Sequence, residues 1–443
     1  MVMKVGLIGN SGREHAIALG LNKNPHTRLV VAGQGKNSAI MRLAETYRET
    51  GFKDTQAIVD YFEDQQVDFV VVGPEATLML GIVDLLRSVG IPAIGPTQAQ
   101  AQLEGDKSFM RHLLRNELGW GSPAWASVSS LTQAKSFMDQ VGAIVVKPLG
   151  LTGGKGVRVM GIQLKDEDEV LDYIAQLLKV DGEVLLEACV IGEEFSRMAF
   201  VSDGQVASVP LMQDFKYAYD GDLGLMTGGM GAYSTPDGGL PFVEDEDLDQ
   251  ADRLLREVVQ ALEKDTEDSY RGFLYGQFMV TKTGIKLIEF NVRLGDPEAL
   301  NLMAILNSDA VEVFSQIATG SLNPNAVAFL PQASVSKYLV PNDYPNPLDQ
   351  PAPFALSEES VAQAGLTLIH GSVEQTSPMQ WLALGSRTFG LVGLGDSPGA
   401  VAATIDAFID QMHIPELRYR KDIGNDAVIR EKVRRMKEIR DDR

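Results

Sequence analysis

Short apolar runs alternate with helical patterns along the first hundred residues of the chain. The apolar runs that predict strands lie at 4–8, 27–32, 68–72 and 92–96. Helical patterns fill the intervals, from about residue 13, over 57–63 and over 80–89. Strands and helices that alternate at this spacing predict a parallel sheet covered by helices.

The remainder of the chain divides into further stretches. A helix-like pattern over 99–118 ends at a linker, Gly119-Trp-Gly-Ser-Pro123. Residues 124–192 predict a small α/β unit around a glycine-rich loop, and 193–325 add strands and two loops rich in Gly and Asp. A last α/β segment begins at about 330 and closes with a charged helix. We therefore expect an α/β protein of several domains.

The composition disfavours several classes of protein. Of 443 residues, 60 are acidic and 39 basic, and the net charge of −21 repels a nucleic-acid backbone or an anionic membrane. The single cysteine, Cys189, excludes an internal disulfide and a cysteine-based zinc site. The N-terminus lacks a signal-peptide pattern, and no apolar run approaches the roughly 20 residues that span a bilayer. We expect a cytoplasmic protein that binds neither nucleic acid nor membrane.

A glycine-bearing turn, 9–14, follows the first predicted strand and opens a helix. Its backbone N–H groups can hold a phosphate, although a simple tight turn has the same pattern. The spacing is not a dinucleotide fingerprint, and Ala32 and Gly33 stand where NAD-binding proteins carry an acid, so dehydrogenase chemistry is disfavoured. The stretches 72–75 and 95–97 end two further strands at the same sheet edge, which favours a small-molecule site over plain loops.

A β-branched strand delivers Lys147 to a glycine-rich loop that carries Lys155 and returns into a second strand at 157–160. This is not a Walker A loop, because no Ser or Thr follows Lys155 and a strand comes next. Two lysines on a strand–loop–strand suit a mobile flap over nucleotide phosphates rather than a plain glycine hairpin. In the strand that follows, backbone groups around 187–190 are placed to bond adenine, and a nearby carboxylate can hold ribose hydroxyls.

Glu289 and Asn291 lie two residues apart in a predicted strand, so both side chains point to one face. This oxygen pair suits Mg²⁺ bridged to phosphates, since Mg²⁺ takes few protein oxygens and keeps water. Arg293 continues the face and can stabilise charge in phosphoryl transfer, and Gln277 adds a ligand if its strand pairs with this one. The alternative is an edge strand with solvated polar residues. The glycine-rich loop at 214–233 is long enough to be functional.

Taken in order, these motifs resemble the phosphoribosylamine–glycine ligase family of the ATP-grasp superfamily, almost from end to end. The most specific matches are Thr227-Gly-Gly-Met-Gly-Ala-Tyr-Ser234 and Glu289-Phe-Asn-Val-Arg-Leu-Gly-Asp-Pro-Glu298. The other matching segments are 9–16, 72–75, 102–107, 146–157, 192–196 and 214–216. Departures from the family pattern, which leave the sugar contact in the second-strand turn open, fall at 32–37, Pro148, Ala188 and the C-terminal third.

The resemblance implies that ATP, glycine and 5-phosphoribosylamine give glycinamide ribonucleotide, ADP and phosphate through a glycyl phosphate, in de novo purine synthesis. The residues that would bind ATP are Lys107, Lys147, Gly153, Gly154, Lys155, Gly156, Glu187, Val190 and Glu194. The residues that would bind the other two substrates are Gly9, Gly12, Arg13, Glu14, Glu75, Asp214, Lys216, Gly228, Gly229, Gly231, Asp296 and Glu298. Arg293 and Lys155 would be catalytic, and the ligands of Mg²⁺ or Mn²⁺ would be Gln277, Glu289 and Asn291.

Within these sets, the resemblance gives Glu187 and the backbone of Val190 to adenine and Glu194 to the ribose. The 9–14 turn and Glu75 would face the sugar phosphate. The other substrate residues would close on glycine and the acyl phosphate.

The fold implied is a three-domain α/β chain that acts as a monomer or a weak homodimer. Its parts are an N-terminal parallel-sheet domain at 1–102, an ATP-grasp domain at 103–329 with a mobile lid at about 124–192, and a C-terminal α/β domain at 330–443. The alternative is another ATP-grasp carboxylate–amine ligase or a formate-dependent transformylase.

Overall fold

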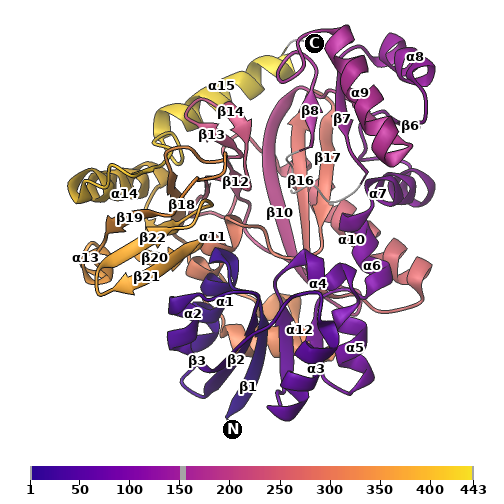
Figure 1. Ribbon diagram of the computed structural model, residues 1–443. Helices are drawn as coiled ribbons and strands as arrows, with labels where there is room; N and C mark the ends of the chain where they lie inside the picture. Colours follow the sequence, from indigo (N-terminus) through magenta and orange to yellow (C-terminus); the bar gives the residue numbers. More distant parts are fainter. Residues whose placement is uncertain (1, 150–155, 442–443) are drawn as a thin grey trace.

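A five-stranded parallel sheet with the order β3-β2-β1-β4-β5 forms the N-terminal domain of the computed structural model, which describes residues 2–149 and 156–441 (Figure 1). Its strands are β1 (Met3–Ile8), β2 (Thr27–Gly33), β3 (Ala44–Glu49), β4 (Phe69–Val72) and β5 (Ala93–Ile94). Every residue of β4 is buried, because a parallel strand inside a helix-covered sheet meets side chains on both faces. The parallel sheet predicted from the sequence is confirmed.

Helices follow the strands of this sheet and begin near its carboxyl edge. They are α1 (Gly12–Asn22), α2 (Ser38–Leu43), α3 (Thr55–Asp64), α4 (Glu75–Met79) and α5 (Ile82–Ser88). The helix predicted over 80–89 is confirmed as α5, and Gly81, with a φ of +75°, separates it from the short α4, which the sequence did not predict. Glu75 thereby becomes the first residue of α4, directly after β4.

The helix-like pattern over 99–118 is also divided. It forms α6 (Gln98–Gly105), α7 (Lys107–Leu113) and a π-helical turn η1 (Leu114–Leu118). Asp106 is extended between α6 and α7, and its carboxylate accepts hydrogen bonds from the backbone N–H groups of Ser108 and Phe109. This cap starts a new helix and sets Lys107 in its first turn.

An antiparallel sheet with the order β11-β10-β16-β17 forms the centre of the molecule. Its strands are β10 (Gly192–Ser202), β11 (Gln205–Ser208), β16 (Arg271–Thr281) and β17 (Gly284–Asn291). The amphipathic helix α10 (Asp245–Thr266) packs on it, and α11 (Glu298–Ile305), α12 (Ala310–Thr319) and a 3₁₀ turn η2 (Pro324–Ala326) follow.

The lid is a separate small α/β unit with the strand order β6-β9-β7-β8, at the upper right of Figure 1. It comprises β6 (Trp125–Val128), α8 (Leu131–Val141), β7 (Ile144–Lys147), β8 (Arg158–Val159), α9 (Glu167–Asp181) and β9 (Val184–Ala188). Its apolar side chains form a core distinct from the main one. A unit with its own core can move as one body relative to the rest.

The C-terminal part contains a sheet with the order β12-β15-β18-β23-β20, and β24 pairs with β18 of this sheet. Its strands are β12 (Gln213–Asp214), β15 (Gly231–Ser234), β18 (Ala333–Pro341), β20 (Thr367–His370), β23 (Phe389–Gly395) and β24 (Leu417–Arg418). Since β12 and β15 precede residue 330, this sheet continues across the predicted domain boundary. The glycine-rich loops at the site are therefore tied directly to the C-terminal domain.

The remaining elements surround this sheet. They are the hairpin β13 (Tyr217–Tyr219) and β14 (Leu223–Met226), the three-stranded sheet of β19 (Ala352–Ala355), β22 (Gln380–Ala383) and β21 (Val373–Ser377), and the helices α13 (Glu358–Gln363), α14 (Pro398–Met412) and α15 (Asp426–Asp441). The α/β fold class predicted from the sequence is confirmed.

Candidate active site

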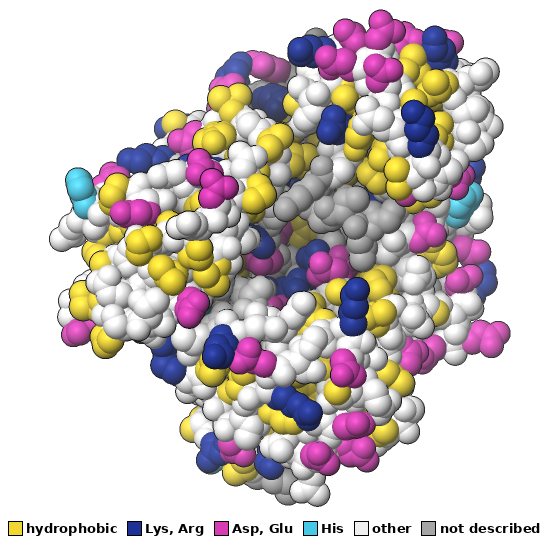
Figure 2. Space-filling model, viewed as in Figure 1, with side chains coloured by type: hydrophobic (Ala, Val, Ile, Leu, Met, Phe, Trp, Pro, Cys, Tyr) yellow, Lys and Arg dark blue, Asp and Glu magenta, His cyan; other side chains and the backbone are white. Residues whose placement is uncertain are grey.

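The predicted site residues lie where the N-terminal, central and C-terminal parts meet the lid. Figure 2 shows a hollow between these parts, with basic and acidic side chains inside it. Antiparallel pairing of β16 and β17 sets Gln277 opposite Glu289 and Tyr275 opposite Asn291, so the strand pairing on which Gln277 depended is present. Glu289 lies within electrostatic reach of four cations, which are Lys107, Lys147, Lys216 and Arg293.

Lys147, the last residue of β7, is buried in an ionic network. Its Nζ lies 2.7 Å from Glu187 Oε2 and donates to the Ile288 carbonyl at 3.1 Å. Arg111 of α7 donates to Glu187 Oε1 at 2.7 Å and to the same carbonyl at 2.9 Å. Burial would raise the pKa of Glu187, but Arg111 and Lys147 outweigh it and lower the pKa.

The network gives Glu187 a structural role. Its carboxylate is occupied by two cations inside the protein, so it holds Lys147 in place and joins the lid to α7. The adenine contacts predicted for Glu187 and for the main chain around Val190 stay predictions.

A second cluster joins residues that the sequence assigned to different substrates. Lys216 Nζ lies 3.2 Å from Glu194 Oε2 and 3.8 Å from Asp214 Oδ2. Gln277 donates through Nε2 to Glu194 at 2.9 Å and to Asp214 at 3.3 Å. Burial would lower the pKa of Lys216, but Asp214 and Glu194 raise it above its ordinary value, so Lys216 is a fixed cation. The predicted ribose residue Glu194 thus borders the predicted glycine residues directly.

Arg293 links the central sheet to the N-terminal domain. Its Nη2 lies 3.1 Å from Glu104 Oε1 and donates to Asn291 Oδ1 at 3.0 Å, while its Nε lies 3.5 Å from Glu75 Oε2. Arg13 Nη2 is 3.9 Å from the same Glu75 oxygen. Burial would lower the pKa of Arg293, but Glu104 and Glu75 raise it. The structure therefore places a permanent cation between the predicted sugar-phosphate residues and the predicted metal ligands.

The 9–14 turn is held from inside by Glu14. Its Oε2 accepts hydrogen bonds from the N–H and Oγ of Ser11 at 2.8 and 2.6 Å, and its Oε1 accepts from Arg13 Nε at 2.6 Å. Gly9 has a φ of +128°, and a Cβ there would lie 2.3 Å from Glu14 Cγ, so the turn requires glycine. Glu14 therefore orients Arg13 and the turn, and Arg13 extends toward Glu75.

Glu298, the first residue of α11, ends a short hydrogen-bond chain. The amide nitrogen of Gln277 faces Glu194 and Asp214, and its amide oxygen accepts a hydrogen bond from the Tyr275 hydroxyl. Glu298 Oε1 also accepts from the Tyr275 hydroxyl, at 2.9 Å. Burial, with the negative charge of Asp214, raises the pKa of Glu298 to about 7. The hydrogen bond from Tyr275 lowers this pKa, but burial and the charge of Asp214 outweigh it.

This carboxyl makes stability depend on pH. The folded pKa lies above the ordinary value of 4.5, so its stabilising contribution is complete below that pH and is lost as pH rises through about 7. We expect Glu298→Gln, which cannot ionise, to gain on the order of 3 kcal/mol relative to the unchanged protein between about pH 5 and pH 8. Thermal unfolding across this range measures it, with the exposed Glu63→Gln as the control. Parallel pH curves for Glu298→Gln and the unchanged protein would contradict the assignment.

Both carboxylate oxygens of Asp296 are used within the protein. Oδ1 accepts from the Tyr338 hydroxyl at 2.7 Å, and Oδ2 accepts from Arg387 Nη2 at 2.8 Å. Arg387 Nη1 also donates to the main-chain oxygens of Gly228 and Gly229 at 2.6 and 3.3 Å. The loop that ends at Gly231, the first residue of β15, is thereby held against Asp296 from the C-terminal domain.

Part of the predicted phosphate loop, Gly153, Gly154 and Lys155, lies outside the described residues. Gly156 is described, and its carbonyl accepts a hydrogen bond from the Tyr173 hydroxyl at 2.7 Å. Strands β7 and β8 pair antiparallel, as the strand–loop–strand prediction requires.

Glu289 and Asn291 have the donor chemistry of a divalent-cation site. Their two oxygens on one face suit a cation that completes its shell with water and phosphate oxygens. No group of three or more His, Cys, Asp or Glu side chains placed to hold a metal occurs in the described part of the chain. Gln277 turns its amide oxygen toward Tyr275, so it has to rotate to serve as a third ligand.

Several side chains at the site were not predicted from the sequence; they are Glu104, Arg111, Tyr275, Tyr338 and Arg387. Arg111 follows Lys107 by four residues on α7, and this spacing on one helix face could have indicated it. Tyr275 lies two residues from Gln277 on one strand face and carried the same kind of signal. Arg387 carried none, because it reaches the site only through the packing of the C-terminal domain.

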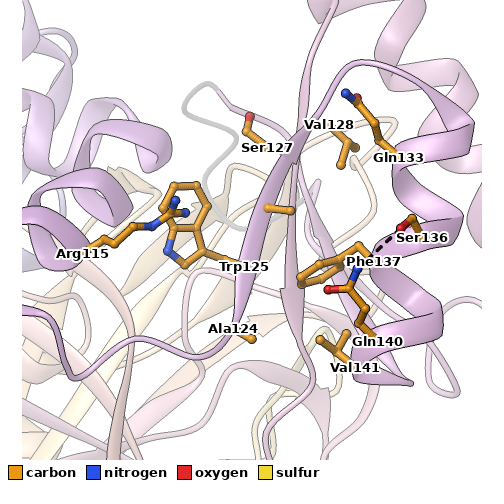
Figure 3. Close-up of a pocket in the computed structure, with 11 residues that line it drawn as sticks. Arg115, Ala124, Trp125, Ser127, Val128, Gln133, Ser136, Phe137, Gln140 and Val141 are labelled. Atoms are coloured by element: carbon orange, nitrogen blue, oxygen red, sulfur yellow. Dashed lines mark hydrogen bonds between the residues drawn. The ribbon is translucent and has the colours of Figure 1, made fainter.

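A pocket of about 590 Å³ lies away from this cluster, on the edge strand β6 of the lid (Figure 3). Its walls come from β6 and α8, and the Arg115 guanidinium covers the Trp125 ring at 3.8 Å. None of the predicted site residues lines it.

Comparison with known proteins shows which family has this fold. Residues 3–104 match the N domain and residues 105–299 the ATP-grasp (A) domain of phosphoribosylglycinamide synthetase. Among solved structures, phosphoribosylamine–glycine ligase from Thermotoga maritima has a TM-score of 0.79 at 23% identity and covers 95% of this chain and 100% of its own. Biotin carboxylase from Campylobacter jejuni has a TM-score of 0.72 at 16% identity, covering 97% of each chain. Fold and site define an ATP-grasp ligase.

Curated relatives specify the family. The phosphoribosylamine–glycine ligase of Methanocaldococcus jannaschii is 39% identical over 99% of this chain and 100% of its own length. That of Methanococcus maripaludis is 37% identical with the same coverage. The chain belongs to the phosphoribosylamine–glycine ligase family. None of the helices in the described ranges is long and apolar enough to cross a membrane.

Proposed function

We propose that this chain ligates glycine to 5-phosphoribosylamine at the expense of ATP, giving glycinamide ribonucleotide, ADP and phosphate in de novo purine synthesis. The observation that carries the proposal is the position of Arg293. It contacts Glu75 of the N-terminal domain and Asn291 of the central sheet, so one cation borders both the sugar-phosphate and the nucleotide sides. A ligase that passes an activated carboxylate to a sugar amine needs these two sides adjacent.

In the proposed reaction, a carboxylate oxygen of glycine attacks the γ-phosphorus of ATP and ADP leaves. The sugar amine then attacks the carbonyl carbon of glycyl phosphate, and phosphate departs with the oxygen that formed the first bond. Lys147 and Lys107 face the phosphates, and Arg293 faces the charge that develops during both transfers. Mg²⁺ or Mn²⁺, held by Glu289 and Asn291 with Gln277 as the predicted third ligand, neutralises phosphate charge when bound.

The acidic composition makes these cations more important for binding the anionic substrates. The net charge of −21 does not attract ATP or a sugar phosphate, so their binding depends on local positive groups. Lys216 between Asp214 and Glu194 offers one cation among carboxylates, which suits the two opposite charges of glycine. ATP contacts at Gly153, Gly154, Lys155, Gly156 and Val190, a cytoplasmic location and a monomer or weak homodimer stay predictions.

A substrate panel tests the proposed function. With ATP, Mg²⁺ and phosphoribosylamine formed from ribose 5-phosphate and ammonia, we expect ADP release with glycine and none above background with formate or bicarbonate. Release driven by formate or bicarbonate instead of glycine would assign the chain to another ATP-grasp reaction. Mass spectrometry of the ribonucleotide product identifies the amine that was acylated.

A further inference from the structure

Arg387 lies between β22 and β23, in the C-terminal domain, yet its guanidinium reaches the central site. Its Nη1 donates to the Gly228 carbonyl at 2.6 Å and to the Asp296 carbonyl at 2.8 Å. Its Nη2 donates to Asp296 Oδ2 at 2.8 Å. One planar group thus joins two segments that are far apart in the sequence, which are the glycine loop (227–231) and the Asp296 turn.

The arginine is itself held on two sides. Its Cζ lies 4.8 Å from the centre of the Tyr338 ring, whose hydroxyl donates to the other oxygen of Asp296 at 2.7 Å. Its carbonyl accepts from the Ser372 N–H at 2.7 Å, and a side chain at Gly371 would lie 2.3 Å from that carbonyl oxygen. The close turn at 371–372 therefore fixes the residue from which the guanidinium extends.

The contacts of the glycine loop show what Arg387 adds. The loop's other bonds include those from Gly229 N–H to Thr227 Oγ1, from Met230 N–H to the Phe215 carbonyl and from Thr227 N–H to the Lys216 carbonyl. None of these three joins the loop to the Asp296 turn. A Cβ at Gly229 would lie 2.5 Å from Pro297 Cδ, so loop and turn are in close contact. Arg387 adds hydrogen bonds across this contact, because it donates to the carbonyls of Gly228 and Gly229 on the loop and of Asp296 on the turn.

We propose that Arg387 is a positioning residue that holds the glycine loop against Asp296 and thereby sets the affinity for glycine. The inference rests on the proposed function, because it takes the loop as a wall of the glycine subsite. It also gives Asp296, which was predicted to bind substrate, a structural contact through each carboxylate oxygen, one with Tyr338 and one with Arg387. The C-terminal domain then contributes to the active site through a side chain outside the segments matched by the two family models.

Kinetics of Arg387→Ala test the proposal. We expect KM for glycine to rise by roughly ten- to hundredfold, because loss of the clamp displaces the subsite wall, while KM for ATP stays within about twofold. Arg387→Lys keeps one donor and is expected to lie between Arg387→Ala and the unchanged protein. If Arg387→Ala does not fold, the KM for glycine of Arg387→Lys tests the proposal instead.

Arg271→Ala is the matched control. Arg271 also binds an aspartate, Asp203, through two guanidinium nitrogens at 2.6 and 2.8 Å, and donates to the Ala318 carbonyl at 3.4 Å. It lies six residues before Gln277 on β16, roughly 20 Å away along the strand. We expect it to leave KM for glycine unchanged. Equal KM values for glycine in all the variants, or an equal rise in Arg271→Ala, would overturn the proposal.

Hydrogen exchange separates this inference from the proposed activity. Peptides that contain the Gly229 and Met230 amides are expected to exchange faster in Arg387→Ala than in Arg271→Ala. If the unchanged protein shows no glycine-dependent turnover, the proposed function fails, whereas the exchange result still decides whether Arg387 holds the loop. Unchanged exchange in Arg387→Ala would overturn the clamp.

Discussion

Arg293→Ala is expected to lower kcat by roughly two to three orders of magnitude, as when a preorganised group that stabilises transition-state charge is lost. The guanidinium is partly buried and is held by Glu75, Glu104 and Asn291, so a replacement group would have to satisfy all three contacts. Steady-state kinetics with saturating ATP and glycine measure the loss.

Arg293→Lys is the control for charge alone. A lysine keeps the positive charge, but it cannot reach Glu75, Glu104 and Asn291 together as the planar fork does. We expect its kcat to remain well below that of the unchanged protein. A normal kcat in Arg293→Ala, with folding shown by circular dichroism, would remove Arg293 from the reaction.

Glu187→Ala is expected to lower the free energy of unfolding by about 3–5 kcal/mol, the usual effect of breaking a buried ion pair. The substitution leaves Arg111 and Lys147 buried together without their carboxylate. Both cations also bond the Ile288 carbonyl, next to Glu289, so a weaker affinity for ATP is expected with the lost stability. Denaturant unfolding and nucleotide titration measure the two effects.

Glu431→Ala provides the matched comparison for Glu187→Ala. Glu431 pairs with Arg434 on α15, but both side chains are more than half exposed. Removing it is expected to leave the unfolding midpoint unchanged, because exposed pairs contribute little. If Glu187→Ala were as stable as Glu431→Ala, the buried network would not hold the lid to α7.

Sequence periodicity predicted the parts of the site that regular elements position. Glu289 and Asn291 follow the two-residue period of β17, and the antiparallel pairing brings Gln277 beside Glu289. Likewise, β-branched residues before Lys147 predicted the strand that buries it. In these cases the side chain's direction follows from local geometry alone.

Other features depend on contacts that no local pattern records. The carboxylate of Glu187 binds Arg111, 76 residues earlier, and this ion pair has no counterpart in the local sequence pattern. The carboxylate of Asp296 accepts a hydrogen bond from Arg387, which lies 91 residues later in a domain with no recognisable motif at that position.

We propose that glycine is phosphorylated by ATP in this hollow and then transferred to the sugar amine. Glycine labelled with ¹⁸O in its carboxylate tests this proposal most directly, by mass spectrometry of the phosphate released in the presence of phosphoribosylamine. We expect one glycine-derived ¹⁸O in each phosphate, together with glycinamide ribonucleotide. Phosphate without the label would contradict it, because glycine would then never have been joined to the γ-phosphorus.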